Sequence, residues 1–297
     1  MNDYVQQVLD DLDRKGDYQP RTYKFYREQC KCVLAYLEEV LPGKDPSNLD
    51  KADLKLFMQS LRRDYAVSTQ RGYVTALRYM CRLNGNDVFN GFQVRYPTDT
   101  RPNVDWLTYE QAQELLNMWK TPLEDMIVVL ELLHGFRRVE VIRLRLRDIH
   151  LDRGYIEVRG KGKLGGKLRS VPMHPDFERA YRRWMEERHT ICKGIVQPKE
   201  DHVLVYRGKG RIKHYEEMKG GGIDHHIKEL SDRAGFSFSN HTLRRTFGRE
   251  LYRSEVSIVV IATILGHNST QTTMKYLGIS LDDMSQAMEK FRLKRVE

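Results

Sequence analysis

The hydrophobic pattern of this chain changes once along its length, and that change limits the possible folds more than any other feature. Residues 1–95 carry apolar side chains at helical spacing almost throughout. The pattern stops at Pro97 and Pro102, and the segment 96–105 has no apolar period. Residues 106–297 then mix helical and strand-like stretches. Because 297 residues suffice for two cores, we predict a helical domain, a short linker and a second, mixed domain.

The N-terminal stretch is expected to form a small bundle of amphipathic helices. Within residues 21–41, one stripe at helical spacing comprises Tyr26, Cys30, Val33, Leu37 and Val40. A later helix is expected to begin at a Ser or Thr cap in "STQRGYVTALRYMCRLNG" and to end at Asn84-Gly85. Periodicity does not tell whether such a bundle binds DNA or another protein.

The charge of the chain indicates a polyanionic partner. Lys and Arg exceed Asp and Glu by 50 to 41, which gives a net charge of +9 and a pI of about 9.3. The four cysteines are too scattered for a zinc site or a disulfide framework. The chain has no apolar run of membrane-spanning length, and its first residues lack the apolar stretch of a signal peptide. We therefore expect a cytoplasmic protein without a membrane anchor.

The glycine-rich segment 158–172, "VRGKGKLGGKLRSVP", contains the Gly-x-Gly-x-x-Gly spacing of nucleotide-binding loops. Such loops lead from a strand into a helix. Here the entry alternates as a strand, with Ile156 and Val158 on one face, but the exit is typical of a second strand that ends at Pro172. We therefore predict a β-hairpin, and its tip and return strand carry Lys161, Lys163, Lys167 and Arg169. It is either a solvated basic turn or a mobile finger that delivers a lysine to an anion.

The second half is expected to be α+β, so the whole chain is mainly α with a small antiparallel sheet. A helix opens at Thr108, which forms a capping box with Gln111. The hairpin and a strand-like stretch, "DHVLVY", supply the sheet, and the chain is mainly helical from about residue 223.

Three motifs in this half place polar side chains at helix ends. Arg137 follows the helix-breaking Gly135, and Glu140 lies one turn later on the same face. In "HTLRRTF", His241 and Arg244 share a helical face.

The third motif is "LGHNSTQTTMKYLG". Gly266 ends a helix, His267 lies at the junction, Ser269 caps the next turn and Tyr276 lies on that short helix. Each of these side chains has an ordinary structural explanation when taken alone. The ordered set Arg, Lys, His-x-x-Arg, His and Tyr is hard to obtain by chance.

This ordered set resembles the tyrosine recombinase, or phage integrase, family, and the similarity covers essentially the whole chain. The family's Gly-apolar-Arg-x-x-Glu pattern appears at 135–140 and its Gly-Lys-Gly hairpin at 160–162. Its His-x-Leu-Arg-x-Thr-Phe pattern appears at 241–247, and its Leu-Gly-His with a Tyr nine residues later at 265–276. The C-terminal sequence looks most like archaeal integrases and Xer-like recombinases.

The resemblance implies a site-specific DNA recombinase with a core-binding domain at 1–95, a linker at 96–105 and a catalytic domain at 106–297. It implies that DNA is cleaved and rejoined through a covalent 3′-phosphotyrosine. The implied catalytic residues are Arg137, Lys161, His241, Arg244, His267 and Tyr276, with Glu140 behind them and DNA contacts from Lys163, Lys167, Arg169 and Arg71. The implied partners are double-stranded DNA and three further copies in a homotetramer on two DNA sites. The resemblance implies that a helix at about 281–293 docks on a neighbouring copy, and its apolar stripe equally fits docking on its own catalytic domain.

Two departures from the family pattern leave alternatives. Arg138 occupies a position that is usually apolar, and the register to the neighbouring Gly and Glu favours Arg137 as the catalytic arginine. The hairpin tip is longer than usual, so Lys163 and Lys167 are rivals to Lys161.

The chemistry of these residue types agrees with the resemblance. Phosphodiester cleavage needs cations on the non-bridging oxygens, a nucleophile and an acid for the leaving oxygen. Arg137 and Arg244 are planar, permanently charged forks, and a tyrosine phenolate can attack phosphorus. The remaining roles fall to His241 as proton acceptor, His267 as hydrogen-bond donor to the phosphate and Lys161 as acid. We expect no metal, which fits the absence of a carboxylate cluster from the sequence. We expect no other cofactor such as ATP, because the covalent intermediate stores the bond energy for religation.

Two other functions stay open at this stage. A type IB topoisomerase has a similar active site but exchanges no strands, and a DNA-binding regulator could keep the fold without catalysis. The small helical N-terminal domain and the C-terminal tail favour the recombinase over the topoisomerase. The complete set of catalytic positions argues against the regulator.

Overall fold

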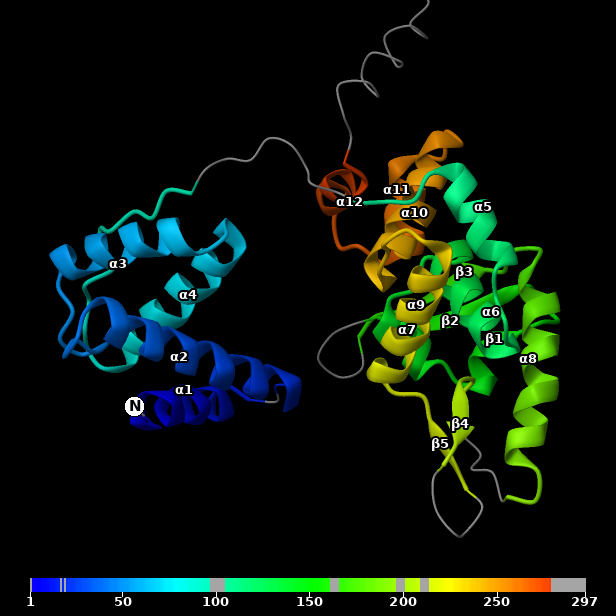
Figure 1. The fold of residues 1–297 in the computed structure, drawn as a ribbon, viewed down its shortest axis with the longest axis horizontal. Helices are drawn as coiled ribbons and strands as arrows, with labels where there is room; N and C mark the ends of the chain where they lie inside the picture. The colour runs from blue at the N-terminus through cyan, green and yellow to red at the C-terminus, as the bar shows by residue number, and fades with distance from the viewer. Residues whose placement is uncertain are drawn as a thin grey trace, which may run out of the picture. The chain divides into compact units, whose positions relative to one another are not determined.

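The computed structural model describes residues 2–16, 18, 20–96, 105–160, 166–195, 201–208 and 214–278. The chain divides into two units, Met1–Asp99 and Thr100–Glu297 (Figure 1). Most of the expected linker, the hairpin tip with Lys161 and Lys163, and the expected helix at 281–293 lie outside the described residues. Among the helices that are described, none is long and apolar enough to cross a membrane.

Helices build the first unit, as expected from its periodicity. They are α1 (Asn2–Arg14), α2 (Pro20–Val40), α3 (Lys51–Asp64) and α4 (Val67–Leu83). The stripe predicted on α2 faces the core, where Cys30, Val33 and Leu37 are buried. Tyr26 and Val40 at the ends of that stripe are partly buried against the same core. Apolar burial of this kind is the main stabilising contribution in a small bundle.

The predicted Ser or Thr cap of α4 is wrong. The helix begins at Val67, and the cap position Ala66 makes no side-chain hydrogen bond. The side chain of Gln70 instead reaches back and donates to the Tyr65 carbonyl at 2.7 Å. This bond ties the first turn to the preceding segment, but an N–H donor does not satisfy the free backbone N–H groups of the helix start, as a capping hydroxyl would. The predicted end is confirmed, because Asn84 is the C-terminal cap.

The second unit combines helices with two small antiparallel sheets. Its helices are α5 (Tyr109–Asn117), α6 (Pro122–Val128), α7 (Arg138–Arg143), α8 (Phe177–Cys192), α9 (Gly220–Ala234), α10 (Asn240–Arg253), α11 (Ile258–Leu265) and α12 (Thr270–Leu277). A π-helical turn, η1 (Val129–Leu133), continues α6, and a 3₁₀ turn, η2 (Leu146–Asp148), precedes the first sheet. One sheet has the order β1 (Ile149–His150), β2 (Tyr155–Arg159), β3 (Leu168–Pro172), and the other pairs β4 (Val205–Arg207) with β5 (Tyr215–Glu217).

The predicted hairpin is confirmed, since β2 and β3 pair antiparallel with Val158 opposite Arg169. Ile156 and Val158 point into the core and are buried. The capping box at the start of α5 is confirmed as well, because Thr108 and Gln111 bond each other's backbone N–H groups. Local patterns were sufficient here because each feature depends on residues close together in sequence.

Helices α10, α11 and α12 lie together at one end of the second unit, at the top of Figure 1, and the β4–β5 hairpin extends from the opposite end. The core between them is apolar and includes Leu130, Phe136, Trp184 and Leu243, all fully buried. The candidate catalytic side chains therefore come from elements that a common core holds together.

His134 is a buried polar group at the end of η1, and only 1% of it is exposed. Its Nδ1 lies 2.9 Å from the Val129 carbonyl, and its Nε2 accepts from the His174 N–H at 3.0 Å. Both ring nitrogens are thus used by the neutral form, with the proton on Nδ1. Burial, the main cause, lowers the pKa of His134 to about 4.

We expect this histidine to make the second unit acid-sensitive. Below the unfolded pKa near 6.5 the unfolded chain binds a proton that the folded chain refuses until about pH 4. Stability therefore falls as the pH drops through that window, by up to ~3 kcal/mol. Denaturant titrations at a series of pH values should show a flatter dependence for His134→Gln. His225→Gln, on the exposed side of α9, serves as control, and equal slopes for wild type and His134→Gln would contradict the assignment.

Candidate active site

The polar residues singled out in the second half converge at the junction of α7, α10, α11 and α12. Arg137 stands at the N-cap of α7, Arg244 lies on α10, His267 follows α11 and Tyr276 lies on α12. The Arg244 guanidinium lies 5.9 Å from the centre of the Tyr276 ring, and the His267 ring meets that ring edge-on at 5.1 Å. Side chains that are up to 139 residues apart in sequence thus share one site.

Gly135 lets the chain turn from η1 into α7. Its φ is +63°, and a Cβ atom there would lie 2.3 Å from the Phe247 ring. Glycine is the residue that fits both constraints. The turn points the Gly135 carbonyl at Arg244, which donates a hydrogen bond to it. This glycine therefore positions Arg137 and Arg244 together.

Glu140 is the common partner of the arginines in the site. Its carboxylate is fully buried and accepts from the backbone N–H and from Nη1 of Arg137, both at 2.8 Å. Arg169 donates to both carboxylate oxygens at 2.9 Å, and Arg244 lies 3.6 Å away. Burial alone would raise the pKa of Glu140, but Arg169 and Arg244 hold it below its usual value. The carboxylate is thus a fixed negative charge.

The C-terminal end of α11 supplies a second anchor for the same arginines. Three successive carbonyls accept from them: Ile264 from Arg169 at 2.7 Å, Leu265 from Arg244, and Gly266 from Arg137 at 3.3 Å. A helix C-terminus carries partial negative charge, so it favours cations there. One carboxylate and one helix end therefore hold three guanidinium groups, and the excess positive charge suits a phosphate.

The arginines differ in exposure. The Arg137 side chain is 24% exposed, against 2% for Arg244. Burial and the nearby Arg137 lower the pKa of Arg244 to about 10, so it stays charged at neutral pH. Arg138, by contrast, pairs with Asp224 on α9. The geometry therefore agrees with the sequence register, which favours Arg137 over Arg138.

His267 is neutral in this arrangement. Its Nε2 lies 3.3 Å from an Arg244 nitrogen, which can only donate, so Nδ1 carries the proton and faces the Thr273 hydroxyl at 2.9 Å. Burial, followed by Arg244 and Arg137, lowers the pKa of His267 to about 4. The sequence offered no signal for Thr273, a fully buried residue that orients this ring.

Tyr276 and His241 complete the group. The Tyr276 hydroxyl donates weakly to the backbone carbonyl of His241, at 3.5 Å. Burial raises the pKa of Tyr276, while Arg244 and Arg245 act in the opposite direction. Burial and the same arginines lower the pKa of His241, which leaves it neutral and able to accept a proton. The phenol is therefore protonated at rest and needs a base to become a nucleophile.

The expected DNA contacts stay predictions. The Arg169 side chain is only 11% exposed and bonds Glu140 and α11. Lys167 is exposed at the start of the returning segment, and its carbonyl accepts from the Gly160 N–H at 2.9 Å. Arg71 is exposed in the first unit, where its guanidinium lies 5.0 Å over the Tyr96 ring.

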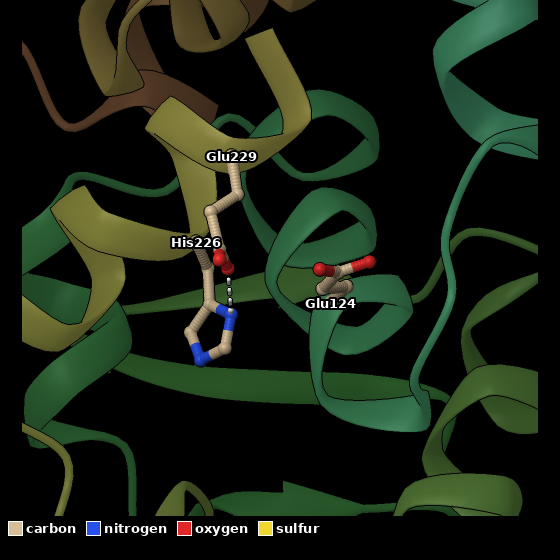
Figure 2. Close-up of side chains that lie close together, drawn as sticks. All are labelled: Glu124, His226 and Glu229. Atoms are coloured by element: carbon tan, nitrogen blue, oxygen red, sulfur yellow. Dashed lines mark ion pairs between the residues drawn. The ribbon is translucent and has the colours of Figure 1, made fainter. Parts of the chain in front are cut away.

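Among the described residues, Glu124, His226 and Glu229 could together hold a metal ion, because their ligand atoms lie within 4.8 Å of one another. Figure 2 shows His226 and Glu229 side by side on α9, with Glu124 facing them from α6. The Glu124 carboxylate already accepts from Arg233 and from a backbone N–H, both at 2.8 Å. Arg233 already balances the charge of this carboxylate, so these contacts favour a structural bridge between α6 and α9.

Comparisons with known proteins show the family and the fold. Residues 105–281 match the phage integrase family. Tyrosine recombinase XerA of Thermococcus kodakarensis is 29% identical over 286 residues, which cover 95% of this chain and 92% of that protein. A crystal structure of XerA recombinase covers 99% of both chains at 21% identity and a TM-score of 0.54. The Tn1549 transposon integrase in complex with transposon right end DNA covers 98% of this chain and 99% of that one, at 17% identity and a TM-score of 0.71.

Proposed function

The chain belongs to the phage integrase family and is a tyrosine site-specific recombinase that acts on DNA, and from this premise we propose that it cleaves and rejoins DNA through a covalent 3′-phosphotyrosine on Tyr276. One observation carries the proposal: Arg137, Arg244, His267 and Tyr276 converge where Glu140 and the end of α11 gather positive charge. A phosphate placed there would face two guanidinium forks and a phenol.

The proposed cleavage step balances as a direct displacement. The Tyr276 oxygen attacks phosphorus and gives its proton to His241, while the bond to the 5′-oxygen breaks. Arg137 and Arg244 stabilise the charge that builds on the non-bridging oxygens. Lys161, at the hairpin tip outside the described residues, donates the proton that the leaving 5′-oxygen takes up. Rejoining reverses these steps with a 5′-hydroxyl of the partner strand.

In this scheme His267 changes its hydrogen-bonding role when a phosphate binds. In the structure its Nε2 accepts from Arg244. A bound phosphate would draw Arg244 to its own oxygens and would raise the pKa of His267, because a nearby anion favours the charged ring. His267 can then donate a hydrogen bond to the phosphate.

We assign DNA binding to both units. Residues 1–95 would act as the core-binding domain and 106–297 as the catalytic domain, joined by the linker at 96–105. The net charge of +9 and the exposed Arg71 and Lys167 support this assignment, as does the DNA held by the Tn1549 integrase. Lys163 would contribute from the hairpin tip. Electrostatic contacts of this kind make affinity depend steeply on salt.

We further propose assembly as a homotetramer on two DNA sites, with the helix at 281–293 docked on a neighbouring copy. Its sequence carries Leu281, Met284, Met288 and Phe291 at helical spacing. Helices α11 and α12 each present an apolar side chain to solvent, since Val259 is 61% and Met274 48% exposed. Docking there would link the position of one active site to the next copy.

A trapping experiment tests the proposed function. Full-length protein is incubated with fragmented genomic DNA from its source, denatured with detergent, and the protein-linked ends are sequenced. We expect recurrent breaks with protein on the 3′ end and a free 5′-hydroxyl on the other. The same sites, placed on two marked duplexes, should then exchange strands. Breaks without exchange would favour the topoisomerase alternative, and binding without any covalent complex would favour the regulator.

A further inference from the structure

Arg169 has more contacts to the site than its place on a basic hairpin suggests. It lies on β3, and its guanidinium bonds two separate anchors: both oxygens of Glu140, and the Ile264 carbonyl at the end of α11. The group also lies 6.0 Å over the ring of Phe136, which is fully buried. Every nitrogen of the fork is therefore used inside the protein.

We propose that Arg169 is a positioning residue, which orients Glu140 and through it Arg137, and which ties the strand returning from the hairpin to the helix end that precedes His267. The proposal rests on the function proposed above, because it concerns the same site. In this proposal Arg169 holds Glu140 and Arg137 in place and does not itself contact DNA.

The sharing of Glu140 explains how Arg169 could act on Arg137. Oε1 accepts from Nη1 of Arg137 and from Nη1 of Arg169, and Oε2 accepts from the Arg137 backbone N–H and from Nη2 of Arg169. The bidentate fork fixes the plane of the carboxylate. Arg137 is more exposed and has fewer anchors, so its direction depends on that plane.

An arginine is needed because two anchors must be reached at once. The Nε–H bonds Ile264 at 2.7 Å while the two terminal nitrogens bond Glu140. A lysine has a single nitrogen and no planar fork. Gly266 leaves room for this arrangement, since a Cβ atom there would lie 2.9 Å from Nη1 of Arg169.

The first arm of the test measures cleavage. Nicked duplexes carrying a genomic site found by trapping are saturated with full-length wild type, Arg169→Lys or Arg169→Gln, and the single-turnover rate of adduct formation is measured beside DNA affinity. We expect unchanged affinity and a rate that falls roughly 10–100-fold in Arg169→Gln, the range typical when a partner of a site residue is removed. Arg169→Lys, which keeps the charge but not the fork, should fall in between.

Arg159→Gln is the matched control. Arg159 is an exposed arginine on β2, opposite Leu168 in the same hairpin. If Arg169 acted only as a basic residue toward DNA, Arg169→Gln would weaken affinity no differently from the exposed control Arg159→Gln and would leave the rate on bound DNA unchanged. That result would overturn the proposal.

The second arm needs no DNA. Unfolding of wild type, Arg169→Gln, Glu140→Gln and the double variant is compared in denaturant. We expect the double variant to lose less stability than the sum of the single losses, because either change removes the same contact. Additive losses would overturn the pairing. Failure of wild type to form any adduct would reject the proposed function. The unfolding comparison would still test the contact between Arg169 and Glu140.

Discussion

Tyr276→Phe is expected to abolish the covalent complex with DNA while leaving DNA binding intact. The hydroxyl makes one long hydrogen bond, to the His241 carbonyl at 3.5 Å, so its removal costs little stability. The ring contacts with His267, Arg244 and Arg245 remain possible for phenylalanine. The measurement is the amount of protein that stays linked to a nicked genomic-site duplex after denaturation.

The matched control for this variant is Tyr252→Phe. Tyr252 lies on α10, with its ring 5.6 Å from Arg249, and so probes another partly buried tyrosine of the same unit. It should form the adduct at the wild-type rate. An undiminished adduct in Tyr276→Phe, or its loss in Tyr252→Phe, would assign the nucleophile to a different residue.

Arg137→Ala is expected to slow cleavage of bound DNA on the order of 10²–10³-fold, as is typical when one preorganised donor to a developing negative charge is lost. The change also removes a side-chain donor from the buried Glu140, but Arg169 still bonds both of its oxygens. The protein should therefore remain folded. Single-turnover cleavage at saturating protein separates this effect from weaker binding.

Arg138→Ala is the control for Arg137→Ala, because it removes the adjacent arginine. The Arg138 side chain is 30% exposed and pairs with Asp224, which is 45% exposed. Ion pairs this exposed contribute about 0–1 kcal/mol. We therefore expect only a small change in rate, and a larger loss for Arg138→Ala than for Arg137→Ala would show that the register of the motif is off by one.

Features that depend on near neighbours in sequence were predictable. Gly135 and Gly266 both adopt positive φ where a helix must begin or end, and glycine is the usual residue there. The capping residue Ser269 and the β2–β3 hairpin were predictable for the same reason. The start of α4 was not, because the helix begins after Ala66, which carries no capping group.

The sequence by itself determined which residues can do the chemistry and in what order they occur, because spacing within each motif places side chains on one helical face or at one helix end. Only the tertiary structure decided their partners. Glu140 accepts hydrogen bonds from Arg137, at the start of its own helix, and from Arg169, on a strand 29 residues away. Arg244 donates to the carbonyls of Gly135 and Leu265, which are 109 and 21 residues away. The basic hairpin sequence therefore predicted a DNA contact for Arg169, whereas in the structure its guanidinium bonds Glu140 and the end of α11. The physical reason is that a buried charged side chain must be paired. Its partners are the groups that the packing of distant elements places beside it.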